Sequence, residues 1–211
     1  MNFRTLALAG TFAAMSSLPS AAAVITLDFE GVGNLNPVGS FYASQGVEFS
    51  PATLAIVDSD AGGSGNFANE PTPDTVMFFL DATQAILNFA AGFEDGFSFF
   101  YTSSTSAFVS VWDGLNGSGN QLGQIEIFGG GNSGTAGDPN GSFDTWSVGA
   151  LAFAGTAKSI NFGGTANRTA YDNITFGSTN PTPTIPVPAA APLLLLGLGA
   201  LGALARRRRR A

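Results

Sequence analysis

Residues 96–112 read Gly-Phe-Ser-Phe-Phe-Tyr-Thr-Ser-Ser-Thr-Ser-Ala-Phe-Val-Ser-Val-Trp, and this stretch decides the fold class. Large apolar side chains occupy every second position in both halves. They are Phe97, Phe99 and Tyr101 in the first half, and Val109 and Val111 in the second. A period of two in aromatic and β-branched residues is typical of strands that bury one face. The stretch therefore predicts two β-strands separated by a short Ser/Thr-rich turn.

Similar runs, bounded by Gly, Asn, Asp or Pro, recur along the middle of the chain, which has no long amphipathic helical pattern. Short, evenly spaced strands of this kind indicate an all-β fold, either a sandwich or a barrel. We predict strands at residues 25–30, 47–50, 75–80, 85–89, 96–101, 107–112, 123–128, 144–148, 159–162 and 172–176.

The composition excludes several classes of function. The 211 residues include no Cys and no His, which removes disulfides, thiolate zinc sites, a cysteine nucleophile and the commonest general base. Between the two ends of the chain the only basic residues are Lys158 and Arg168, against 15 Asp and Glu, a net charge of −13. Nucleic-acid binding needs clustered Lys and Arg, so we expect no nucleic-acid partner. A divalent cation is a more natural partner for this surface.

The N-terminus has the features of a secretory signal peptide. Arg4 precedes the apolar run 6–15, Pro19 breaks the helix, and Ala21 and Ala23 are small residues ahead of a cleavage position. An apolar run this short does not span a bilayer of about 30 Å. We therefore predict a signal peptide at residues 1–23 and a mature domain that begins at Val24.

The C-terminus has three parts. Residues 178–188 are rich in Pro and Thr, residues 189–205 carry no charge, and residues 206–211 begin with five arginines. A helix over 189–205 would cover roughly 25 Å, enough for a bilayer when arginines snorkel to the interface. Because basic flanks stay cytoplasmic, we expect this transmembrane helix to leave the acidic domain outside.

This order of a Pro-containing motif, an apolar helix and a terminal Arg cluster resembles the PEP-CTERM sorting signals of Gram-negative bacteria. The resemblance covers only the last residues of the chain and is closest to the variant with Val-Pro-Leu-Pro-Ala, here with Val in place of Leu. It implies processing by an exosortase-type protease at the inner membrane, in organisms that make exopolysaccharide, and then delivery to the cell surface or extracellular matrix. The residues that carry it are Ile185, Pro186, Val187, Pro188, Ala189, Arg206, Arg207, Arg208, Arg209 and Arg210.

The domain at residues 24–177 resembles the β-sandwiches found ahead of such tails, which are compared with jelly-roll carbohydrate-binding modules. Two short motifs carry this resemblance, Leu-Asp-Phe-Glu-Gly at 27–31 and Tyr-Asp-Asn-Ile-Thr-Phe at 171–176. In jelly-roll modules the first and last strands often lie near each other, and a structural calcium can bridge them. The resemblance thus implies a β-sandwich with Ca²⁺ held by Glu30 and Asp172.

The remaining candidate residues are open to more than one interpretation. The loop that begins at Asp58 starts like a calcium loop, but Gly62 stands where an EF-hand needs an oxygen side chain and Asn69 stands where it needs Glu. Among the aromatic residues, which mostly suit a core, Trp112 is the candidate for a sugar contact because it ends a strand beside Asp113. Residues 94 and 95 are adjacent acids that would face opposite sides of a strand, so they do not form a catalytic pair.

Three functions follow from these features. We favour an exported, non-catalytic protein with a structural or adhesive role at the cell surface or in the exopolysaccharide matrix. A calcium-stabilised carbohydrate-binding module is the alternative, and it requires an exposed aromatic strip on a sheet. A glycan-cleaving enzyme is the third, and it requires two facing carboxyl groups across a cleft.

Overall fold

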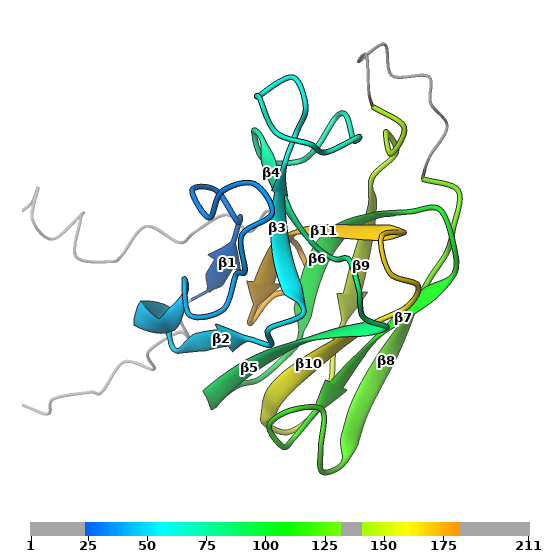
Figure 1. Ribbon diagram of the computed structural model, residues 1–211. Coiled ribbons are helices and arrows are strands. Elements are labelled where there is room, and N and C mark those ends of the chain that lie inside the picture. The colour runs from blue at the N-terminus through cyan, green and yellow to red at the C-terminus, as the bar shows by residue number, and fades with distance from the viewer. Residues whose placement is uncertain (1–23, 132–140, 182–211) are drawn as a thin grey trace, which may run out of the picture.

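The computed structural model describes residues 24–131 and 141–181, which form two antiparallel β-sheets packed face to face (Figure 1). The six-stranded sheet has the order β3-β4-β11-β6-β9, with β1 also paired to β11, and the five-stranded sheet has the order β2-β5-β10-β7-β8. The chain crosses repeatedly between the sheets, as in a jelly roll. The strands are β1 (Ile25–Leu27), β2 (Val47–Phe49), β3 (Thr53–Val57), β4 (Thr75–Phe79), β5 (Gln84–Phe93), β6 (Phe97–Ser103), β7 (Ala107–Trp112), β8 (Gln121–Ile127), β9 (Ser147–Leu151), β10 (Ala157–Gly163) and β11 (Thr169–Phe176), with one 3-10 helix, η1 (Ala43–Gln45).

Aromatic side chains build the core between the sheets. Phe97 and Phe99 of β6 stack with centroids 5.5 Å apart, and Phe99 meets Phe162 of β10 and Tyr171 of β11 edge-on. All four are buried. Edge-to-face and offset contacts of this kind stabilise a core beyond the area they bury. The apolar residues that alternate within 96–112 are therefore the ones that point into the core between the sheets.

A bulge in β11 changes which residues face the core. Its pairing with β6 shifts register between Asp172 and Thr175, and Asn173 has a positive φ of 49°. An extra residue in one strand reverses the side-chain parity beyond it. As a result Tyr171 before the bulge and Ile174 after it, three positions apart, both belong to the core.

The outer face of the six-stranded sheet is covered by loops. Met77 of β4 points into the main core, so Phe78 points to the opposite face, yet only 4% of Phe78 is exposed. Phe67 packs edge-on against Trp146 with centroids 6.5 Å apart, and the Trp146 indole N–H donates to the carbonyl of Ala68. These residues form a second, smaller apolar cluster outside the sandwich.

The structure confirms the predicted β-sandwich, and each predicted strand overlaps an observed one. One strand, β3, was not predicted, although Thr53-Leu-Ala-Ile-Val57 is rich in β-branched residues. Residues 50–52 form a short turn between β2 and β3. The strand predicted at 144–148 is β9 at Ser147–Leu151, because the backbone of Asp144 instead bonds to the Gly131 carbonyl.

Within the described ranges no helix is long and apolar enough to cross a membrane. The signal peptide predicted at 1–23 and the sorting motif and transmembrane helix predicted at 185–210 lie outside these ranges.

Candidate ligand-binding face and carboxylate cluster

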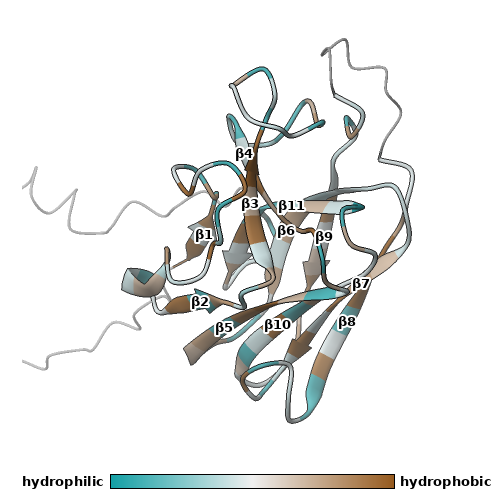
Figure 2. Ribbon diagram, in the orientation of Figure 1, coloured by the Kyte–Doolittle hydropathy of each residue, from teal (hydrophilic) through white to brown (hydrophobic). Residues whose placement is uncertain are grey.

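The outer face of the five-stranded sheet carries polar and aromatic side chains. Leu87, Val109 and Ile160 point into the core, so their neighbours in β5, β7 and β10 point outward. Figure 2 shows the resulting alternation of hydrophilic and hydrophobic bands along β8 and β10. The strand registers place these outward residues in adjoining rows: Glu48, Asn88, Ser159, Trp112 and Gln121; Ile86, Asn161, Ser110 and Gln124; Gln84, Gly163, Phe108 and Glu126.

Side-chain amides form hydrogen bonds across this face. The Asn161 amide N–H donates to Oε1 of Gln84 at 2.9 Å, and the Gln124 amide N–H donates to Oε1 of Glu126 at 2.7 Å. The Asn161 Oδ1, by contrast, is buried and has no hydrogen-bond partner in the described part of the chain. A buried acceptor without a donor costs free energy, so the Asn161 amide would gain a hydrogen bond if a rotation of the side chain exposed this oxygen to a hydroxyl group.

Two aromatic rings lie on the same face. Trp112 is partly exposed, and its indole N–H donates to the Ser110 hydroxyl at 2.9 Å, which fixes the ring beside the amides. Phe108 is 37% exposed and lies against Gly163, where a Cβ atom would come 2.2 Å from the ring. Glycine at this position therefore lets the Phe108 ring lie close to the sheet.

The β7–β8 loop, residues 113–120, bounds this face on one side. Asn116 and Asn88 exchange two hydrogen bonds of 2.8 Å, and the Ser159 hydroxyl accepts from the Gly117 N–H and donates to the Gly114 carbonyl. At the base of the loop, hydrogen bonds from Asn120 to the side chain of Asp113 lower the pKa of that carboxyl. The hydrogen bonds to Asn88 and Ser159 fasten the loop to β5 and β10.

The structure brings Glu30 and Asp172 to the same segment of chain. Glu30 Oε1 accepts from the backbone N–H groups of Asp74 and Thr75, at 3.0 and 2.9 Å. Asp172 Oδ2 accepts from the backbone N–H and the hydroxyl of Thr72, at 3.0 and 2.7 Å. The loop at 72–75 therefore joins the two acids, and the motifs at 27–31 and 171–176 gave no indication of it.

Tyr42 holds the Leu-Asp-Phe-Glu-Gly motif at 27–31 in place. Its hydroxyl accepts from the Phe29 N–H at 2.6 Å and lies 3.3 Å from Oδ1 of Asp28. Phe29 has a positive φ of 61°, so this hydrogen bond holds a conformation that non-glycine residues rarely adopt. Burial, and next the charge of Asp28, raise the pKa of Tyr42, which keeps its proton available for that carboxylate.

Burial raises the pKa of Asp172 to about 7, against the combined effect of hydrogen bonds from Thr72 and the Asn173 N–H, which lower it. Glu30 adds a smaller upward contribution. Within the described residues no Lys or Arg forms an ion pair with Asp172. A buried carboxylate beside a second one gains most from a positive charge between them.

The oxygen atoms around Glu30 and Asp172 are of the kinds that a hard cation binds. Besides the carboxylates of Glu30 and Asp172, it contains the Thr72 hydroxyl and the Asp28 carbonyl, which are 3.4 Å apart. Calcium accepts carboxylate, hydroxyl and carbonyl oxygens. No group of three or more His, Cys, Asp and Glu side chains suited to a metal is found in the described ranges. A calcium ion here would need neutral oxygens and water to complete its shell.

The adjacent acids judged unsuitable as a catalytic pair do not lie in a strand. Glu94 and Asp95 occupy the turn between β5 and β6, and Asp95 has a positive φ of 70°. Both are exposed, and Glu94 accepts from the Thr156 hydroxyl at 2.7 Å. The sequence prediction that they face opposite sides of a strand was wrong, because β5 ends at Phe93 and the chain turns directly after it.

No protein-family model matches the chain, and no curated protein matches it. Some solved structures resemble the chain at low identity and low TM-score. One is a carbohydrate-binding module from Cellvibrio mixtus lichenase 5A in complex with cellotriose, with 14% identity, a TM-score of 0.36, and coverage of 61% of this chain and 88% of that one. TmCBM61, in complex with β-1,4-galactotriose, has 12% identity, a TM-score of 0.39, and coverage of 68% and 97%. The K1 cleaved adhesin domain of Lys-gingipain from Porphyromonas gingivalis W83 has 11% identity, a TM-score of 0.41, and coverage of 75% and 100%.

Proposed function

We propose that this chain is an exported, non-catalytic surface protein that adheres to polysaccharide through the outer face of its five-stranded sheet. The observation that carries the proposal is the pair of outward-facing rings of Trp112 and Phe108, with the side-chain amides of Asn161 and Gln124 in the row between them. Sugar rings combine an apolar C–H face with a rim of hydroxyls. Aromatic rings pack against the C–H face, and side-chain amides form hydrogen bonds with the hydroxyls.

The sorting part of the proposal comes from the two ends of the chain. A signal peptide at 1–23 exports the domain, and the motif at 185–189 with the arginines at 206–210 makes the tail a substrate for an exosortase-type protease. Processing at the inner membrane would then release the domain to the cell surface or the exopolysaccharide matrix. Mass spectrometry of the native secreted protein would identify both termini and any attached group.

We further propose that Ca²⁺ supports the domain at Glu30 and Asp172, a structural role and not a part of sugar binding. The reason is that two buried or half-buried acids meet there without a positive charge. Calcium would neutralise them, and it would tie the β1 end of the chain to β11.

The test of sugar binding compares variants at the sheet face. Purified full-length chain in non-ionic detergent is run through gels that contain soluble polysaccharides or the exopolysaccharide of the producing cells, and retardation is measured. Trp112→Ala should weaken binding about tenfold, which corresponds to a lost contact of about 1.4 kcal/mol. The matched control is Phe41→Ala, because Phe41 is 49% exposed but contacts Tyr42 at the other end of the domain.

Two outcomes separate the competing functions. If the wild-type chain is retarded by none of the polysaccharides, sugar binding is wrong and a purely structural role remains. If polysaccharide is shortened during the assay, the non-catalytic assignment is wrong, and the glycan-cleaving alternative replaces it.

A further inference from the structure

A wide groove lies at one end of the five-stranded sheet, beside the proposed sugar-binding face. It offers about 980 Å³ of space open to solvent, near the upper end of the roughly 300–1,000 Å³ usual for small-molecule sites. Its lining consists of residues 50–52 between β2 and β3, residues 81–83 between β4 and β5, residues 164–166 between β10 and β11, and Gln84 and Ile86 of β5. Gln84 and Ile86 also belong to the outward rows of the sheet, so the groove and the sheet face are continuous.

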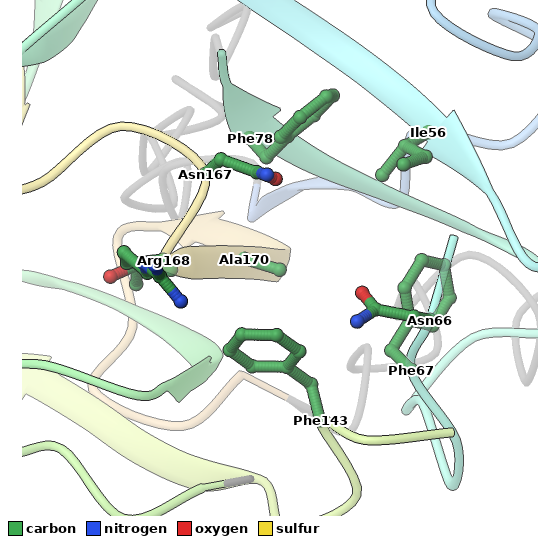
Figure 3. Close-up of a pocket in the computed structure, with 9 residues that line it drawn as sticks. Ile56, Asn66, Phe67, Phe78, Phe143, Asn167, Arg168 and Ala170 are labelled. Carbon is green, nitrogen blue, oxygen red and sulfur yellow. The ribbon is translucent and has the colours of Figure 1, made fainter. Parts of the chain in front are cut away.

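The outer face of the six-stranded sheet has no comparable room within the described ranges. Figure 3 shows Ala170 of β11 with Phe67, Phe78 and Phe143 around it. The space left among the residues there is about 30 Å³, which holds about one water molecule and is too small for a sugar ring. Of the two outer faces, that of the five-stranded sheet is therefore the one that can accept a glycan.

The β7–β8 loop, residues 113–120, covers the row of the sheet face that lies farthest from the groove. It bonds to the side chains of Asn88 and Ser159 in that row, and Ser159 is fully buried. The rows nearer the groove carry exposed side chains, such as Gln84. A glycan that contacts Trp112 therefore has its open path toward the groove.

Aromatic and polar groups follow one another along this path. Trp112 and Phe108 lie on the same face of β7, four residues apart, which separates them by roughly 13 Å. The hydrogen bond from Asn161 to Gln84 crosses from β10 to β5 toward the groove. The Phe108 ring lies over Gly163, which pairs with Gln84 at the mouth of the groove. One sugar ring cannot contact both aromatic rings, so contact along the whole path needs several linked sugars.

Hydrogen bonds between the turns hold the walls of the groove. The Gly164 N–H donates to the Thr83 carbonyl at 2.9 Å, which joins two of the turns. The Ser50 N–H donates to the Ile86 carbonyl at 2.8 Å, and the Ile86 N–H donates to the Ser50 hydroxyl at 3.0 Å. A site whose backbone is held before binding loses less entropy when a ligand binds.

The charges along the path are negative. Glu48 and Glu126 stand in the outward rows and Asp81 lines the groove, whereas these rows and the groove lining contain no Lys or Arg. Lys158 precedes the row that the loop covers, away from the groove. Asp81 and Thr165 are exposed in the groove and can bond sugar hydroxyls. The same carboxylates repel a ligand that carries negative charge.

From this geometry we infer that the proposed sugar site takes a segment of neutral polysaccharide, several linked sugars long, that extends from Trp112 into the groove. The inference rests on the proposed function and adds to it the length and the charge of the ligand. Trp112 and Phe108 contact C–H faces, and the Gln84 amide bonds hydroxyls beside them. Asp81 and Thr165 bond hydroxyls of the sugars in the groove. A single sugar contacts only one part of this path, and an acidic polymer meets carboxylates of its own sign along it.

The test uses the full-length chain in non-ionic detergent with soluble glucan, galactan and mannan as neutral polymers and polygalacturonate as an acidic one. Polygalacturonate should retard the wild type in gels less than the best neutral polymer does. That neutral polymer is cut to disaccharides and hexasaccharides, which are titrated by calorimetry. We expect the hexasaccharide to bind at least tenfold more tightly than the disaccharide, because only the longer ligand reaches from Trp112 to the groove.

Variants of exposed residues separate the groove from the sheet face. Thr165→Arg places a long side chain in the groove, so it should weaken hexasaccharide binding about tenfold and leave disaccharide binding unchanged. Asp81→Ala removes a charged acceptor and should weaken hexasaccharide binding about fivefold. Trp112→Ala should weaken the binding of both oligosaccharides, because both contact that ring.

The controls are Thr156→Arg and Asp60→Ala, which make the same changes of side chain and charge at exposed positions outside the path. Both should bind the hexasaccharide as the wild type does. Melting temperatures of all variants are measured in parallel, so that loss of binding is scored only in folded protein.

Equal affinities for the disaccharide and the hexasaccharide would overturn the inference. Unchanged hexasaccharide binding by Thr165→Arg would also overturn it, and if Trp112→Ala still lost binding, the sheet face would stand as a sugar site without the groove. Stronger retardation by polygalacturonate than by every neutral polymer would reject the neutral ligand. If no polymer retards the wild type, the proposed function itself fails, and the inference fails with it.

Discussion

The carboxyl group of Asp172 is fully buried and accepts three hydrogen bonds, from two donors of Thr72 and from the Asn173 N–H. Burial still dominates and raises its pKa to about 7, from an ordinary value of 3.8. Between these pH values the folded chain therefore holds a proton that the unfolded chain has released. Because the folded state binds more protons there, the free energy of unfolding falls as the pH rises.

The fall in the free energy of unfolding with rising pH can be tested in the calcium-free protein. In chelator, the contribution of Asp172 to the free energy of unfolding should decrease by about 1 kcal/mol per pH unit from roughly pH 4 to pH 7, and stay constant above. Asp172→Asn, which cannot titrate, should remove this slope. Urea denaturation at several pH values measures it as the difference between wild type and variant. Glu48→Gln is the control, and parallel pH curves for wild type and Asp172→Asn would contradict the prediction.

The sequence indicated Glu30 and Asp172 through two short motifs but not the loop that joins them. Thr72 contacts Asp172 across 100 residues of sequence, and no local pattern encodes a contact at that separation. The pKa of Asp172 likewise depends on how deeply the fold buries it, which the residue types alone do not determine. Trp112, in contrast, was predictable as a partly exposed ring, because it ends an alternating strand whose valines fill the core.

Individual strands were predicted correctly where apolar and polar residues alternate clearly. They were missed or misplaced where this alternation is weak. The boundaries of β7 were predicted without error because Val109 and Val111 alternate with outward residues. The bulge in β11 could not be predicted, because Asn173 sits in a run of strand-forming residues and only the pairing with β6 shows the extra residue. The packing of Phe67 against Trp146 over the outer face of the six-stranded sheet could not be predicted for a similar reason, because both residues lie in loops, which carry no periodic signal.

At the level of elements, calcium should connect the loop after β1 to β11. A cation that binds only the folded chain adds about 2.7 kcal/mol of stability at one hundred times its dissociation constant, enough to raise the melting temperature by several degrees. Asp172→Ala should abolish this rise, because it removes a ligand on β11. Melting is compared in calcium and in chelator at matched ionic strength, so that screening does not contribute.

Glu126→Gln is the control for the calcium prediction, because Glu126 is an exposed acid on the opposite sheet. It should keep the full rise in melting temperature. If calcium and chelator give the same melting temperature for the wild type, the two acids are structural carboxylates and do not bind calcium under these conditions.

At the level of the whole molecule, the sorting signal at the C-terminus and the folded domain should act independently of each other. Replacing the arginines at 206–210 with Ser should leave the melting temperature of the domain unchanged, because all of the core residues lie between 27 and 176. The same change should disturb orientation at the membrane and lower the amount of protein that reaches the cell surface. Cell fractionation with surface protease digestion measures that amount. Normal delivery of the variant would contradict the sorting proposal.

The pairing of β1 with β11 has a mechanical consequence. β11 lies between β4 and β6 and also bonds to β1, with Phe176 at its end opposite Ile25. Beyond Phe176, the Gly177 N–H donates to the Gly96 carbonyl, and the Ser178 carbonyl accepts from the Ser98 hydroxyl. A pull applied at Pro181 along the axis of β11 is perpendicular to the hydrogen bonds of its ladders. Those bonds carry the tension together, in shear, and do not open one after another. A domain pulled along this axis from its C-terminal end would therefore resist unfolding for longer than one whose last strand is peeled away one hydrogen bond at a time.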